Sequence, residues 1–201
     1  MKISNIRACI FYYICVVENV EYLDAFQDTL EQGLIKICKS CNVLSDDSLV
    51  DGKFFLSPDI EERWASMMKE YVADAVENFN DYSDAAIGFA SFLGMAVAFQ
   101  WDTDWESHCK DPYQAYYGSR GFDDMDDHIL LEVLGLEASD ASYIGTLMLS
   151  CTSAVQALIR RENIEIQTEL GFYVLARAYA TMFRVGAAVE LARLGYKKYS
   201  I

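Results

Sequence analysis

The sequence is poor in proline and histidine. Only Pro58 and Pro112 occur in 201 residues, and a β-sandwich of this length would need more turn-forming residues, whereas long helices need few. The two histidines, His108 and His128, are too few for a zinc site built from three histidines. The scarcity of proline therefore favours a helical fold, and the scarcity of histidine narrows the available metal chemistry.

The motifs of several common enzyme classes are missing as well. The sequence has no glycine-rich phosphate loop, no nucleophile elbow and no H-E-x-x-H motif. It also lacks the Glu-x-x-His pairs with which helical bundles hold metal ions in their core. The sequence thus indicates no catalytic residue and requires no cofactor, and it favours a protein that is not an enzyme.

Basic residues are few, and acidic residues are concentrated in the middle of the chain. The chain has 16 Lys and Arg against 31 Asp and Glu, a net charge of −15. Residues 42–140 alone hold 22 acidic and 5 basic residues. This negative field disfavours nucleic acids and anionic membranes and leaves basic proteins, cationic ligands or metal ions as partners. The plainer interpretation is that the excess acid only keeps an apolar-rich protein soluble.

Cysteine spacing and the N-terminal segment indicate a cytoplasmic protein. Six irregularly spaced cysteines do not form a disulfide framework in a chain of this size, so we expect reduced thiols. The apolar run 8–17 resembles a short signal peptide, but no cleavage site follows it, and Glu18 comes at once. We expect a single α-helical domain over 1–201, in which the segment 1–20 is the least certain.

Apolar residues recur at spacings of three and four along most of the chain, which is typical of amphipathic helices. Ser57 and Pro58 open one such helix, and Asp81 or Ser83 is expected to cap the next. Residues 6–17 could be a helix or a lone strand, with the helix favoured, and 42–57 is a polar loop. The other predicted helices cover 20–38, 84–105, 112–117, 123–134, 141–158 and 164–194.

These elements predict an all-α fold, a single bundle of about six to eight helices arranged mostly as antiparallel hairpins. We expect 84–105, 140–161 and 164–194 at its centre. Residues 85–101 carry no charge but have acidic flanks, so a buried helix is a better interpretation than a membrane span.

A stripe of small residues follows one face of that uncharged helix, and it predicts a close helix–helix contact. The stripe consists of Ala86, Ala90, Gly94 and Ala98. We expect it to pack against the last helix near Ala176, Ala180 and Ala187, with Gly94→Leu overpacking the core and Gly94→Ala tolerated. The same stripe could instead form a homodimer seam.

The densest polar cluster surrounds the end of this helix. If the helix continues, Asp104 and His108 share a face, and such a pair could hold a metal ion. Aromatic side chains nearby could wall a ligand pocket. The plainer interpretation is that the tryptophans complete the core while the polar groups face water. The candidate ligand or metal residues here are Trp101, Asp102, Asp104, Trp105 and His108.

A second cluster, at 123–128, adds Asp124 and His128 as candidates. The plainer interpretation is that Asp123 caps a helix and its acidic neighbours favour the positive end of the helix dipole. The charge distribution therefore carries the functional expectation. We expect a non-catalytic helical protein that binds a basic protein through residues 42–140, as an immunity or inhibitor protein does. The alternative is a metal-dependent enzyme or ligand-binding protein with a site near Trp101 and His108.

Overall fold

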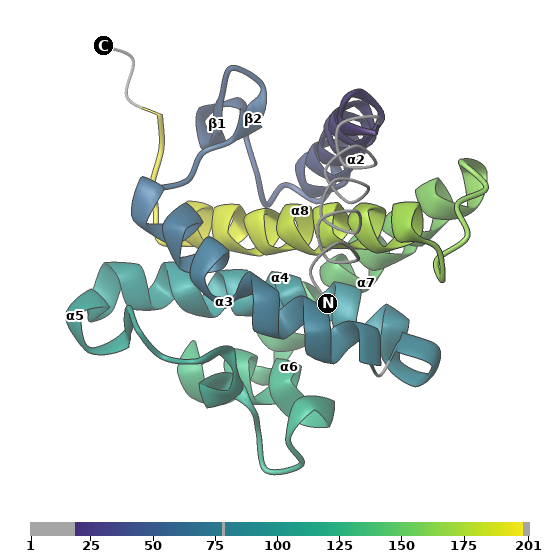
Figure 1. Ribbon diagram of the computed structural model, residues 1–201. Coiled ribbons are helices and arrows are strands. Elements are labelled where there is room, and N and C mark those ends of the chain that lie inside the picture. The colour runs from purple at the N-terminus through teal and green to yellow at the C-terminus, as the bar shows by residue number, and fades with distance from the viewer. Residues whose placement is uncertain (1–18, 78, 199–201) are drawn as a thin grey trace.

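The computed structural model describes residues 19–77 and 79–198. The predicted element at 6–17 lies outside the described residues. Within them the fold is all-α, as the sequence predicted (Figure 1). The five long helices are α2 (Val20–Ser40), α3 (Pro58–Glu77), α4 (Phe79–Thr103), α7 (Ala138–Arg161) and α8 (Glu169–Arg193).

Shorter elements connect the long helices. The short helices are α5 (Trp105–His108) and α6 (Met125–Asp127). Single turns of 3-10 helix cover Asp46–Ser48, Tyr113–Tyr116 and Phe122–Asp124, and a π-helical turn covers His128–Val133. The predicted loop 42–57 contains one small antiparallel hairpin, in which β1 (Leu49–Val50) pairs with β2 (Lys53–Phe54).

Local signals set several of the helix ends. The Ser57 hydroxyl accepts a hydrogen bond from the Asp59 amide at 3.3 Å, as expected for a cap before Pro58. Thr168 caps α8 by accepting from the Gly171 amide at 3.1 Å, so α8 begins later than predicted, at Glu169. The predicted cap at Asp81 or Ser83 is wrong, because α4 already begins at Phe79.

Helices α4 and α8 run parallel through the middle of the molecule and approach closely (Figure 1). A Cβ atom added at Gly94 would overlap the Phe183 carbonyl oxygen, and one added at Gly186 would overlap the Ser91 carbonyl oxygen. The small-residue stripe therefore packs on α8, around Phe183 and Ala187. Because α8 covers it, the stripe does not form a homodimer seam. The expectation that Gly94→Ala is tolerated is also wrong, since the neighbour is backbone that cannot move aside.

Helix α7 lies at the side of the bundle rather than at its centre, which corrects the prediction for 140–161. It packs on α2, α4 and α8 through one face, while Tyr143 and Leu149 on the other face are 49% and 65% exposed. The prediction placed it at the centre because its sequence is uncharged, and much of the outer face consists of Ser and Thr. The hydroxyls of Thr146, Ser150 and Ser153 donate to carbonyls four residues earlier, which satisfies them without charge.

By length and composition, Ala85–Thr103 and Ala138–Arg161 could each cross a membrane. The most apolar stretch of the first is 72% buried inside the molecule, as in the core helix of a soluble protein, and that of the second is 44% buried. The core helices of soluble proteins pass the same test, so these two helices are weak evidence for a membrane protein.

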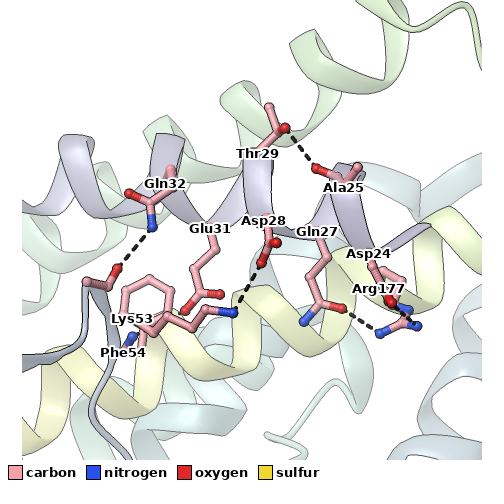
Figure 2. Close-up of polar contacts among 11 residues, drawn as sticks. Asp24, Ala25, Gln27, Asp28, Thr29, Glu31, Gln32, Lys53, Phe54 and Arg177 are labelled. Atoms are coloured by element: carbon pink, nitrogen blue, oxygen red, sulfur yellow. Dashed lines mark hydrogen bonds and ion pairs between the residues drawn. The ribbon is translucent and has the colours of Figure 1, made fainter. Parts of the chain in front are cut away.

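Polar contacts join the outer helices to α8 and to the hairpin. Arg177 of α8 donates to Gln27 at 2.7 Å and to Asp24 at 3.0 Å on α2 (Figure 2). On α3, Glu61 pairs with Arg184 of α8 at 2.9 Å. Figure 2 also shows the hairpin held against α2 by a hydrogen bond from the Phe54 amide to Glu31.

Candidate functional site: an acidic aromatic corner

Most of the predicted site residues lie where α4 ends and α5 begins. Asp104 separates the two helices, with φ −156° and ψ 67°. Because this backbone is not helical, Asp104 and His108 do not lie on one continuous helix face, which was the basis for pairing them as metal ligands. The break leaves Asp104 exposed between two partly buried tryptophans, Trp101 and Trp105.

Trp101 links three parts of the chain at this corner. Its indole Nε1 donates to Asp59 Oδ2 on α3 at 3.2 Å. Its ring meets that of Tyr196 edge to face, with the centroids 5.5 Å apart. The Tyr196 hydroxyl in turn donates to Asp102 Oδ1 at 2.5 Å. Two carboxylates thus flank an aromatic pair and are oriented by it.

Two further acidic side chains, Asp104 and Glu106, follow Asp102 closely in the chain, and both are exposed. We define the acidic corner as Asp59, Trp101, Asp102, Asp104, Glu106 and Tyr196. Carboxylates attract ammonium and guanidinium groups by charge, and the faces of aromatic rings attract both groups by cation–π contact. The arrangement therefore suits lysine and arginine side chains of a partner.

His108 is engaged locally. Its Nδ1 lies 2.8 Å from Asp111 Oδ2, and both side chains are about one-third exposed (38% and 33%). Trp105 packs against the core beside it. In the part of the chain that the structure describes, no three His, Cys, Asp or Glu side chains come together as a metal-binding group.

Asp124 lies in a different place and stabilises a turn. Its carboxylate accepts hydrogen bonds from the Arg120 amide at 2.9 and 3.0 Å and from the Ser119 hydroxyl at 3.0 Å. Burial alone would raise the pKa of Asp124, but the hydrogen bonds from Arg120 and Ser119 lower it below its usual value. The close fit extends to Gly118, where an added Cβ would lie 2.6 Å from Asp124 Oδ1.

His128 is likewise paired within its own turn, with Nδ1 3.1 Å from Glu132 Oε2. The structure thus joins Trp101 and Asp102 through Tyr196, and Asp104 and Trp105 follow them in the chain. His108, Asp124 and His128 instead have separate local partners. Asp123 was expected to cap a helix, but it lies inside the 3-10 turn Phe122–Asp124.

Sequence reasoning missed Asp59 and Tyr196. They lie 42 and 94 residues from their partners Trp101 and Asp102. No local spacing connects them, so only the packing of α3 and of the chain after α8 could identify them. Comparison with models of protein families, with curated proteins and with solved structures finds no match to this chain.

Proposed function

We propose that this chain is a non-catalytic helical interaction protein of the cytoplasm whose acidic corner binds a basic protein partner, as an inhibitor or immunity protein does. The observation that supports it most is the pairing of Asp59 and Asp102 with the aromatic rings of Trp101 and Tyr196. These contacts hold the carboxylates in place before a partner arrives, which reduces the entropy lost on binding.

The charge distribution supports the same proposal. The four carboxylates of the corner belong to residues 42–140, which hold 22 acidic and 5 basic residues, so a basic partner is steered toward it over a Debye length of about 8 Å at physiological salt. Nucleic acids and anionic membranes would be repelled by the same field.

A salt-dependent pull-down with a matched pair of variants tests the proposal. Asp104→Asn with Glu106→Gln removes two exposed charges from the corner, and Glu21→Gln with Glu165→Gln removes two exposed charges elsewhere. We expect the wild type and the second variant to retain a basic protein at low salt and release it at high salt, and the first variant to lose most of it. Equal retention by both variants, or capture of acidic proteins only, would contradict the proposal.

The rival function, a metal-dependent enzyme with a site near Trp101 and His108, has a separate test. Elemental analysis of the purified protein should find no stoichiometric Fe, Mn or Zn if the interaction proposal is correct. One bound metal ion per chain, lost in His108→Ala, would support the rival instead.

A further inference from the structure

A cavity of about 360 Å³ lies between the start of α7, the end of α8 and the turn that follows α2. This volume falls within the range of small-molecule sites, about 300–1,000 Å³. Its walls include Val43, Ile144 and Val189, and its polar groups include Asp140, Tyr143 and Arg193. None of these residues belongs to the acidic corner, so the cavity is a separate candidate binding site.

The positive charge of the Arg193 guanidinium is already compensated by an ion pair. Its Nε and Nη2 donate to the two carboxylate oxygens of Glu190 at 2.8 and 2.6 Å, and Glu190 is fully buried. Hydrogen bonding to Glu190, with the further negative charge of Asp140, raises the pKa of Arg193. One cation therefore lies between two carboxylates, and the second of these, Asp140, is exposed at the cavity.

Two of the remaining polar groups, Tyr143 and Asp140, favour a ligand that donates hydrogen bonds. Tyr143 uses its own proton to bond the Cys41 carbonyl at 2.6 Å, so its oxygen keeps lone pairs to accept from a ligand. Asp140 lies in the first turn of α7, and its exposed carboxylate offers further acceptor oxygens. A negative group of a ligand would meet an excess of negative charge here.

We propose that this cavity binds an amphipathic organic cation, with its apolar body between Val43, Ile144 and Val189 and its ammonium group on Asp140. This inference does not depend on the acidic corner or on the proposed protein partner. The apolar wall contributes most of the affinity by removing surface from water, and Asp140 decides which charge is accepted.

Three probes with one shared indole ring test the charge preference: tryptamine, tryptophol and indole-3-acetate carry a cation, a neutral group and an anion. Calorimetric titration of the full chain should show tryptamine binding at least about tenfold more tightly than indole-3-acetate, with tryptophol between them. Asp140→Asn should weaken tryptamine about tenfold and leave tryptophol nearly unchanged. Glu165→Gln, which removes one exposed charge elsewhere, should change neither.

A second variant tests the location. Ala192→Phe places a ring in the cavity from a partly buried position near the end of α8, and it should abolish binding of tryptamine and tryptophol while the melting temperature is kept. The inference is overturned if tryptamine binds Ala192→Phe as well as the wild type, which would indicate general attraction to an acidic surface. It is also overturned if indole-3-acetate binds as tightly as tryptamine, or if no probe binds at millimolar concentration.

Discussion

Gly94 and Gly186 lie where α4 and α8 come closest, and each faces backbone of the other helix. An added Cβ at either position would come well within 3.0 Å of a carbonyl oxygen, a separation that Cβ atoms essentially never show. A flexible side chain could yield, but these carbonyls are held in helices. The two glycines therefore set the distance between the central helices.

We expect Gly94→Ala to be destabilising by about 1–3 kcal/mol or more, because the methyl group forces α4 and α8 apart and opens packing on both sides. Gly33→Ala is the matched control, since nothing lies within 4 Å of a Cβ there. In α2 it should stabilise by about 0.5–1 kcal/mol through higher helix propensity. Chemical denaturation measures both, and a Gly94→Ala protein as stable as the parent would contradict the close contact.

Asp124 and Asp126 should respond to pH with opposite signs. The pKa of Asp124 is lowered in the folded protein, so its ionised form stabilises the fold above the usual Asp pKa of about 4, and this contribution is lost as pH falls through the lowered value. Asp124→Asn should therefore melt below the wild type at pH 7, and the gap should close as pH falls below about 4.

Burial is the largest effect on Asp126, and it raises the pKa of this carboxyl, so its ionised form costs stability once pH rises above about 4. Asp126→Asn should then have a higher melting temperature than the wild type at pH 7 and the same melting temperature at low pH. Thermal melts across pH 2 to about 7 measure both differences; a lower melting temperature for Asp126→Asn at pH 7 would show that the charge is favourable there.

At the scale of elements, the β1–β2 hairpin depends on α2. Glu31 is only 3% exposed, and its Oε1 accepts the Phe54 amide at 3.2 Å (Figure 2). Gln32 donates to the Gly52 carbonyl at 2.9 Å, and Lys53 pairs with Asp28 at 3.2 Å in an exposed position. A hairpin of two-residue strands is not stable alone, so these contacts hold it.

Glu31→Ala should leave the Phe54 amide without its acceptor and cost about 1–3 kcal/mol, with faster hydrogen exchange at Phe54 as the direct readout. Asp28→Asn removes the exposed ion pair on the same helix and should cost less than about 1 kcal/mol. If exchange at Phe54 is unchanged in Glu31→Ala, the hairpin is held by its apolar contacts alone.

At the scale of the whole molecule, the net charge of −15 opposes folding through self-repulsion. Many of the ion pairs in the described part are exposed and contribute little to stability. Added salt should therefore weaken the repulsion among acidic side chains more than it weakens the attraction within ion pairs. Raising KCl from low to physiological concentration should increase the melting temperature by about 2–4 °C, equivalent to about 1 kcal/mol. The double variant Glu21→Gln, Glu165→Gln should show a smaller increase, and a melting temperature that falls with KCl would contradict net repulsion.

Most of the helical segments can be identified from the sequence, because helix formation follows local signals. Apolar residues three and four apart, Ser57 before Pro58, and the small-residue stripe around Gly94 all act within a few turns of chain. The stripe also indicated correctly that α4 would meet the last helix near Ala187, since only short side chains allow that approach.

Which side chains meet at the site, and how deeply each helix is buried, depends on packing between elements that are distant in the sequence. Asp59 and Tyr196 reach Trp101 and Asp102 across 42 and 94 residues, and Asp140 reaches Arg193 because α7 folds back on α8. The sequence of α7 predicts a central helix, but α7 lies at the side of the bundle. Its exposed Ser and Thr hydroxyls donate to carbonyls of the same helix, so the exposed face carries no charge and looks in sequence like the face of a buried helix. Periodicity shows that a face is apolar, but its partner is chosen by the packing of distant elements, which no local spacing encodes.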